Sequence, residues 1–362
     1  MAPGGQKQTC TMRDSIQRVR DVIHGRIPDR APLFELIRND AVISHFAGRK
    51  LTVQNAEEVV FAAYAPAVDA TRPAVRLPKD EAAETLPDGR KRSNYRWTVW
   101  TERVRYADSA AYAAAKRKQI DAFDPTWTQT HREQMDGYLA SVEDHRRRLG
   151  EVFFFPGGRG VGLMGIFGEV GLEQFSYYLA DCGDVIDELL ECNTVAAETW
   201  IAHLPDDHGL EAVFVGDDMA FKSGPLVAPA WLDEHYFPRF SRVTGAWHAK
   251  GVKVLFHSDG NLMPILDRLV EAGIDGLNPI EVLAGMDVAE IHRRHPKLWM
   301  TGGIDVSQLL PFATPQQVAD AVKRTLDAAG GRIMIGSSTE LQYTVPLENF
   351  LAMRQAVLDY SY

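Results

Sequence analysis

The sequence predicts an α/β fold, a (β/α)8 TIM barrel built as a single domain over residues 1–362, with an inserted lid or cap at about residues 75–150. The first observation is that short apolar runs alternate with amphipathic stretches, a pattern typical of parallel strands joined by right-handed helical crossovers. The second is that polar residues gather where the predicted strands end, the face on which barrel enzymes carry their chemistry. An open doubly wound sheet is the alternative, and no firm nucleotide fingerprint supports it.

Seven apolar runs predict strands, one fewer than a closed barrel needs. They cover residues 31–37, 151–158, 211–218, 252–259, 276–281, 297–305 and 331–340. Helical patterns follow at about 170–180, 184–204, 229–251, 262–273, 286–296, 314–331 and 346–360. The helix that begins after Thr314 has the clearest start, because a capping threonine precedes Pro315 in the first turn.

The segment from 75 to 150 fits the alternation worst. Its stretch RKRSNYRWTVWTERVRYA, residues 90–107, is rich in aromatic and β-branched side chains and predicts an antiparallel hairpin. Two helical stretches follow it. We therefore expect a lid beside the barrel mouth, in which Tyr95, Trp97 and Trp100 cover an apolar or aromatic substrate.

Composition restricts the partners and the compartment. The formal net charge is −10 and the pI is near 5.6, whereas a protein that neutralises nucleic-acid or membrane phosphates carries a basic face. A small-molecule substrate is therefore expected, with no nucleic-acid or membrane partner. The odd set of Cys10, Cys182 and Cys192 has no CxxC spacing and suits a reducing compartment. With no apolar leader and no long apolar run, a cytoplasmic location is expected.

The stretch KVLFHSDGNL, residues 253–262, ends a predicted strand with His257 and Asp259 two positions apart. Side chains alternate along a strand, so these two are expected on the same face. Carboxylates also end the neighbouring predicted strands, at Asp217, Asp218, Glu281, Asp305 and Glu340. A histidine among carboxylates at one barrel mouth suits a divalent-metal site or a general acid–base cluster, and the spacing does not choose between them.

The same residues have structural interpretations. A histidine beside a carboxylate is often a pair that holds no metal. An aspartate after a strand commonly caps the next helix or loop, which applies to Asp217, Asp218 and Asp305. Glu340 suits a surface loop equally well, whereas Glu281 needs a partner if it is buried.

A long C-terminal stretch resembles a known superfamily. HSDGNLMPILDRLVEAGIDGLNPIEVLAGMDVAEIHRRHPKLWMTGGID, with TPQQVADAV and VPLENFLAM after it, is similar to the C-terminal half of the uroporphyrinogen decarboxylase superfamily, which includes zinc-dependent methyltransferases that act with corrinoid proteins. The resemblance covers residues 150–358 well and 12–40 weakly. It implies a (β/α)8 barrel with its active site in the cleft at the strand ends, and a homodimer is common in the superfamily.

Departures from the family pattern narrow the implied function. Porphyrin decarboxylases have an arginine-rich MRQAGRY-like stretch after the first strand, where this chain has LFELIRND with Arg38 alone. They also have a histidine near the last strand, where this chain reads GSSTEL. Porphyrinogen decarboxylation is therefore not expected.

The methyltransferase branch has a His-x-Cys motif and a second cysteine near the final strand. This chain keeps His257 and replaces both thiolates, the first by Asp259 and the second within residues 337–340. The resemblance implies a divalent metal, with zinc expected first, held by His257, Asp259, Glu281 and Glu340. Fewer soft ligands weaken the selectivity for zinc.

Two other motifs are weak. Gly160, Gly162 and Gly165 match GxGxxG after a predicted strand, but the pattern is equally expected of a loop packed over a barrel mouth. DDHGLE, residues 206–211, is similar to the Asp-x-His-x-x-Gly of corrinoid-binding domains except that Glu211 replaces the glycine. A corrinoid, if used, is therefore expected on a separate partner protein.

These observations predict a metal-dependent methyltransferase or O-demethylase for a small methylated substrate, such as a methoxyaromatic, with a corrinoid protein or a thiol as methyl acceptor. The predicted catalytic residues are Asp217, Asp218, His257 and Asp259. The first alternative is a metal-free decarboxylase of a small non-porphyrin acid, in which Arg38 or Lys222 binds the carboxylate and Asp217 transfers the proton. The second is a barrel that serves as a non-catalytic subunit.

Overall fold

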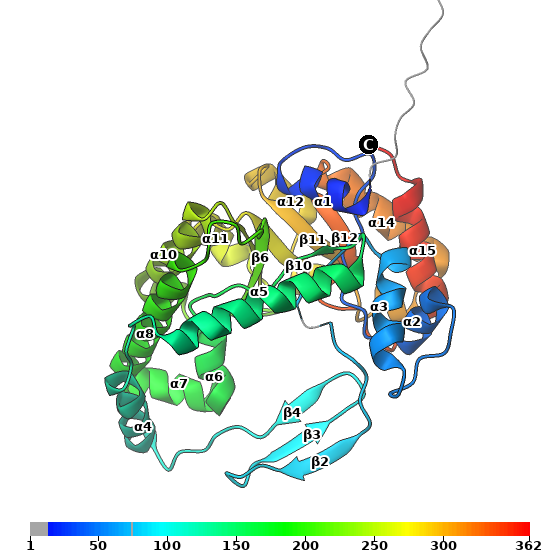
Figure 1. The fold of residues 1–362 in the computed structure, drawn as a ribbon. Helices are drawn as coiled ribbons and strands as arrows, with labels where there is room; N and C mark the ends of the chain where they lie inside the picture. Colours follow the sequence, from blue (N-terminus) through cyan, green and yellow to red (C-terminus); the bar gives the residue numbers. More distant parts are fainter. Residues whose placement is uncertain (1–13, 74) are drawn as a thin grey trace, which may run out of the picture.

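The computed structural model describes residues 14–73 and 75–362, and Figure 1 shows the arrangement of its helices and strands. Residues 1–13 lie outside the described residues. They include Cys10 and the stretch in which no apolar leader was predicted. The described chain is an α/β protein with parallel strands, as the alternating pattern predicts. No helix within residues 14–73 and 75–362 is long and apolar enough to cross a bilayer.

Five parallel strands form the main sheet, in the order β12-β11-β10-β9-β6. They are β6 (Ala212–Gly216), β9 (Lys253–His257), β10 (Gly276–Ile280), β11 (Trp299–Ile304) and β12 (Ile333–Ser337). Nearly all of their residues are buried, because both faces of a parallel sheet are covered. A second parallel pair joins β1 (Ala70–Thr71) to β5 (Phe153–Phe154).

Single parallel bridges connect these two sheets. Leu33 pairs with Ile335 of β12, and Phe34 pairs with Ala70 of β1. On the other side, Gly157 pairs with Phe214 of β6. The parallel pairings therefore continue from β12 through the segment 33–37, β1 and β5 to β6. All seven predicted strand regions take part, and β1 is the eighth.

The helices lie outside the strands (Figure 1). They are α1 (Ser15–Ile23), α2 (Asp40–Ala47), α3 (Ala56–Ala67), α4 (Ser109–Asp121), α5 (Gln129–Leu149), α6 (Leu163–Val170), α7 (Leu172–Asp181), α8 (Gly183–Ala202), α9 (Pro229–Trp231), α10 (Phe237–Ala249), α11 (Leu266–Glu271), α12 (Val288–Arg294), α13 (Leu309–Phe312), α14 (Pro315–Ala329) and α15 (Leu347–Asp359). Thr314 caps α14 as predicted, with a capping box to Gln317. The predicted helix 229–251 is interrupted by a π-helical turn (Leu232–Tyr236).

The buried side chains form two clusters. The larger one fills the space between the strands and the outer helices. The smaller one lies between α1 and the strands, and it includes Val22, Phe155, Leu255, Trp299 and Met334. Helix α1 therefore packs against the strands with its apolar face. This helix was not among those predicted from the sequence.

The predicted insert contains an antiparallel sheet of three strands rather than a two-stranded hairpin. The strands are β2 (Ala82–Thr85), β3 (Lys91–Asn94) and β4 (Val99–Thr101), in the order β2-β3-β4. Strand β2 was missed because AAET carries neither aromatic side chains nor a clear alternation, and all four residues are exposed. Figure 1 shows this sheet extending away from the rest of the chain, and its role as a lid stays a prediction.

Candidate functional site

Three side chains from two neighbouring strand ends converge. Asp218 follows β6, His257 ends β9, and Asp259 follows β9. One ligand atom from each lies within 4.8 Å of the others, and they are the cluster of histidine, cysteine and carboxylate side chains in the described residues that could hold a metal ion. The register that pairs Gly216 with His257 brings the two strand ends side by side.

Asn278 of β10 fixes the tautomer of His257. The His257 Nδ1 atom lies 2.7 Å from the amide oxygen of Asn278, whose own amide nitrogen donates to the hydroxyl of Thr301. Nδ1 is therefore the protonated nitrogen, and Nε2 carries a lone pair 3.4 Å from Oδ1 of Asp218. Burial, together with the nearby Arg72 guanidinium, lowers the pKa of His257 to about 4. The imidazole is neutral at physiological pH, which is the form that binds metals.

Asp259 has an unused acceptor at this site. Its Oδ1 atom is buried without a hydrogen-bond partner in the described part of the chain, and its Oδ2 atom has only a long contact of 3.5 Å with the hydroxyl of Thr339. Burial raises the pKa of Asp259 to about 6, and the carboxylates of Asp218 and Glu281 add to the shift. A buried carboxylate oxygen is costly unless a proton or a cation satisfies it.

The three groups fit a divalent metal ion. They offer one neutral imidazole nitrogen and two carboxylates, and the buried Asp259 oxygen is the atom that a cation would satisfy. Nitrogen and oxygen donors bind zinc and other first-row divalent ions, whereas the lack of thiolates reduces the preference for zinc.

Of the predicted metal ligands, Glu281 and Glu340 are not part of this cluster. Glu281 accepts the backbone N–H of Gly260 at 2.8 Å and so holds the turn after β9. Glu340 accepts from Arg38 at 2.5 Å and lies 3.6 Å from Arg72. The structure therefore brings His257 and Asp259 together with Asp218, while the two glutamates are held by other partners.

Arg72 is a site residue that the sequence analysis missed. It follows β1, is 9% exposed, and donates to the backbone oxygen of Thr339 at 3.2 Å. Its guanidinium lies over the Phe214 ring, 5.1 Å from the centroid, and its Nε atom has no partner in the described structure. Burial lowers the pKa of Arg72, although Glu340, Asp259, Glu35 and Asp218 oppose the shift. Thr339 itself has a φ of 111°, a strained value for a β-branched residue.

Glu35 is the second missed residue. It is 2% exposed and accepts both the backbone N–H and the hydroxyl of Ser337 at 2.8 Å. Burial raises the pKa of Glu35 to about 7. The available signal was a single charged residue inside the apolar run APLFELI, which indicates a buried carboxylate in need of partners.

Asp217 is directed away from the cluster. Its carboxylate accepts the backbone N–H groups of Gly162 at 3.1 Å and Met164 at 2.7 Å, and the hydroxyl of Tyr236 at 3.0 Å. Burial raises the pKa of Asp217 to about 6. The carboxylate thus occupies N–H groups of the GxGxxG loop that a phosphate would need, and the catalytic role predicted for Asp217 is not part of the function proposed below.

The remaining predicted residues have other surroundings. Lys222 is exposed in the turn between β7 (Ala220–Phe221) and β8 (Gly224–Pro225). In the insert, Tyr95 and Trp100 are each 49% exposed, whereas Trp97 is buried and donates to Asp40 at 3.0 Å. Asp305 accepts the N–H groups of residues 307–309, which is the capping role expected for it.

Comparison with known proteins identifies the family. The profile described as Uroporphyrinogen decarboxylase (URO-D) matches residues 168–360, which include Asp218, His257 and Asp259. Among solved structures, a methyltransferase from Methanosarcina mazei is similar with a TM-score of 0.67 and 14% identity, over 96% of this chain and 98% of that chain. At this identity the likeness concerns the fold. No curated protein matches. Because the profile covers more than half of its 362 residues, the chain belongs to the uroporphyrinogen decarboxylase (URO-D) family.

Proposed function

We propose that this chain is a divalent-metal-dependent methyltransferase or O-demethylase whose metal ligands are Asp218, His257 and Asp259. The observation that carries the proposal is their convergence, with a neutral imidazole nitrogen and an unpartnered buried carboxylate oxygen in one place. This set replaces the predicted one, because Asp218 takes the place of Glu281 and Glu340. Zinc is the first metal to test, and other first-row divalent ions follow.

We infer further that the parallel strands form a (β/α)8 barrel with this site at its mouth. The chain of pairings from β12 through residues 33–37, β1 and β5 to β6 supports the inference. The family and the fold of the methanogen protein support it independently. Active sites of such barrels lie at the carboxyl ends of the strands, where His257 and Asp259 stand.

When bound, the metal supplies a Lewis acid for a methyl-bearing oxygen or sulfur, or for an acceptor thiol. The protein residues supply position and charge. Asn278 holds the His257 ring with Nε2 toward the cluster, and Arg38 and Arg72 offer cationic groups for an anionic part of the substrate. Tyr95 and Trp100 are exposed aromatic side chains that suit an aromatic substrate in the proposed lid.

The proposed substrate is a small methylated compound such as a methoxyaromatic acid, and the methyl acceptor is a separate corrinoid protein or a thiol. Supporting observations are the URO-D family and the methyltransferase fold of the solved neighbour. A separate acceptor is also consistent with Glu211 in place of the last glycine of a corrinoid-binding motif.

A second candidate is decarboxylation of a small acid. The observation that favours it is a pair of arginines, Arg38 and Arg72, each with a buried Nε atom that has no partner in the described chain. Nearby, Glu35 has a pKa raised to about 7 by burial, so it can deliver or accept a proton at neutral pH.

The deciding experiment measures methyl transfer and carbon dioxide release from a panel of methoxybenzoates, with a reduced corrinoid protein or a thiol as acceptor. Methyl transfer that is lost on chelation, restored by zinc, and lost in His257→Ala supports the first proposal. Carbon dioxide release that survives chelation supports the second. His45→Ala is the matched control, because His45 is an exposed histidine of α2. Neither product under any condition would favour the non-catalytic subunit.

A further inference from the structure

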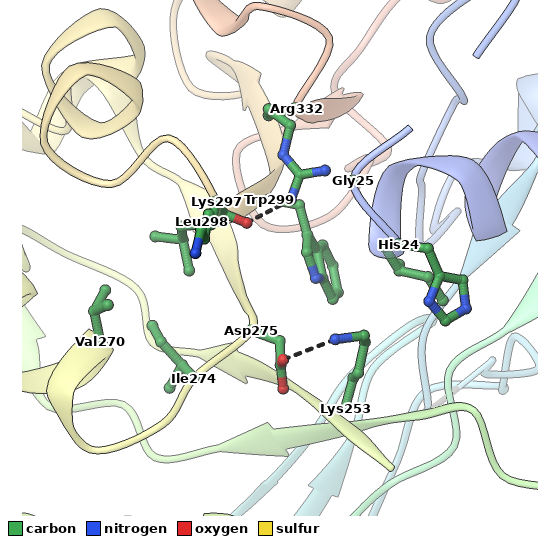
Figure 2. A pocket seen from close by; sticks show the side chains of 11 residues that line it. His24, Gly25, Lys253, Val270, Ile274, Asp275, Lys297, Leu298, Trp299 and Arg332 are labelled. Carbon is green, nitrogen blue, oxygen red and sulfur yellow. Dashed lines mark hydrogen bonds and ion pairs between the residues drawn. The ribbon is translucent and has the colours of Figure 1, made fainter. Parts of the chain in front are cut away.

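A cavity of about 380 Å³ lies at the amino-terminal ends of the strands, and Figure 2 shows the residues around it. Lys253 lines it at the start of β9, whereas His257 ends the same strand. At about 3.3 Å per residue, the two positions are separated by about 13 Å along the strand. The cavity is therefore distinct from the metal cluster, and neither the proposed reaction nor the family match accounts for it.

Arg332 brings a buried positive charge to this cavity. It is 9% exposed and donates to the backbone oxygens of Val22 and Lys297. Its Nε atom is buried and has no partner, and no carboxylate of residues 14–73 and 75–362 forms an ion pair with it. Burial lowers the pKa of Arg332, and no acidic side chain opposes the shift. A buried guanidinium is stabilised when an anion reaches its free donor.

The other titratable groups on the cavity wall are also mainly basic. His24, Lys253 and Lys297 line it together with one carboxylate, Asp275. That carboxylate is already occupied, because it accepts Lys253 Nζ at 3.1 Å and the backbone N–H of Val254 at 2.8 Å. His248 contacts it too, at 2.8 Å. The wall thus has an excess of positive charge that its own acidic group does not neutralise.

An aromatic ring and aliphatic side chains form the rest of the wall. Trp299 is 1% exposed, and its indole nitrogen has no hydrogen-bond partner in the described residues. Figure 2 shows the indole between Arg332 and the Asp275–Lys253 pair, with Val270 and Ile274 on one side. Two residues that each have a buried donor without an acceptor therefore line one cavity, beside apolar side chains.

We propose that this cavity is a second ligand site, which binds a small organic anion with a carboxylate on an aromatic or branched apolar body. The carboxylate accepts from Arg332 and is drawn in by Lys297, while the apolar body packs against Trp299 and Ile274. The cavity volume of about 380 Å³ lies in the range of small-molecule sites. Because the site opens at the end opposite to His257, its ligand is not the substrate of the proposed reaction. Its binding stabilises the folded chain by mass action.

The test is a titration of the ¹⁵N-labelled protein with benzoate, followed through the indole NMR signals. The Trp299 signal is assigned with Trp299→Phe. We expect benzoate to move this signal and to raise the melting temperature by several degrees at saturation. Benzamide, which has the same shape without the charge, should do neither. The same titration of His257→Ala should give the same result, since the proposed reaction site does not take part.

The matched variants are Lys297→Glu and Lys323→Glu, which reverse one exposed lysine each. Lys297 lines the cavity, whereas Lys323 lies on α14 away from its wall. We expect Lys297→Glu to weaken the affinity for benzoate at least tenfold and Lys323→Glu to leave this affinity unchanged. The proposal would be overturned by a Trp299 signal that does not move at high benzoate concentration or by equal binding of benzamide. An equal loss of benzoate affinity in both lysine variants would also overturn it. Binding of inorganic phosphate without benzoate would overturn the proposed ligand class.

Discussion

The Nε2 atom of His257 faces Oδ1 of Asp218 at 3.4 Å, although the neutral histidine offers only a lone pair there. Two acceptors that face each other at this distance repel, unless a proton or a cation lies between them. Burial lowers the pKa of His257 to about 4, so no proton lies between the two atoms at neutral pH. The pair therefore favours a cation, and the unpartnered oxygen of Asp259 supplies the third donor.

We predict that His257→Ala and Asp259→Asn each weaken zinc binding by more than about 100-fold, beyond the 10–100-fold typical of residues that only orient ligands. The affinity should also fall as the pH drops below 6, because burial raises the pKa of Asp259 to about 6 and only its ionised form binds a metal. Calorimetric titration of the chelated protein measures both effects. His45→Ala is the control, and unchanged zinc affinity in His257→Ala would contradict the assignment.

Asn278 is proposed to act on metal binding through His257, as a positioning residue. Its amide fixes the Nδ1–H tautomer, and it is itself held by Thr301. We predict that Asn278→Ala weakens metal binding about 10–100-fold and lowers the free energy of unfolding by about 1–3 kcal/mol, because it leaves two buried polar groups unpaired. Thr301→Val should show a smaller loss of metal affinity. A stability loss without any change in metal affinity would show that Asn278 is structural only.

Arg72 is predicted to hold down the pKa of His257. After burial, the Arg72 guanidinium is the largest cause of the lowered value, which is about 4. Arg72→Met removes the positive charge and should raise this pKa, whereas Arg72→Lys should leave it low. The measurement is an NMR titration of the histidine ring signals in the metal-free protein. A pKa that stays unchanged in Arg72→Met would mean that burial alone sets it.

Much of the fold could be predicted from the sequence, because each long strand is a buried apolar run with a helix after it. Strand β1 could not, since its ladder is only two residues long and lies in VDATRP, which has no alternation to detect. Arg72 was missed for the same reason, because its place at a strand end follows from β1. Antiparallel pairing within residues 90–107 was predicted, whereas the third strand, β2, was not.

The metal cluster could be predicted only in part. The His257-x-Asp259 spacing predicted two members of the cluster, because alternation of side chains along an extended stretch is a local property. The choice between Asp218 and Glu340 depends on contacts far apart in the chain. Arg38 pairs with Glu340 across 302 positions, and this pairing occupies the carboxylate that the sequence offered as a ligand. Such pairings leave no periodic signal.

We predict that Glu35 makes the stability of the folded chain depend on pH. Burial raises its pKa from 4.5 to about 7 in the folded chain, so the folded state binds a proton that the unfolded state has lost between these values. Stability from this group is therefore complete below pH 4.5 and is lost as the pH rises through 7, by on the order of 3 kcal/mol. Urea unfolding at several pH values should show this decline, and Glu35→Gln should flatten it. An equally steep decline in Glu35→Gln would assign the effect to another group.

Substitutions of the two adjacent aspartates that follow β6 should distinguish effects on stability from effects on metal binding. Asp217 is 1% exposed and satisfies two backbone N–H groups at the start of α6, so Asp217→Asn should lower the free energy of unfolding by about 2–3 kcal/mol while zinc affinity is kept. Asp218→Asn should change stability by less than about 0.5 kcal/mol, because its amide oxygen can still accept the N–H of Asp259.

The same Asp218→Asn protein should lose zinc binding, since a neutral amide replaces a charged ligand. Urea unfolding measures the free energy of unfolding of each variant, and calorimetric titration measures its zinc affinity. The two substitutions are chemically identical and one residue apart, so general effects of charge removal cancel in the comparison. The opposite result, with zinc affinity lost in Asp217→Asn and kept in Asp218→Asn, would assign the metal to the glycine-loop side of β6 and away from His257.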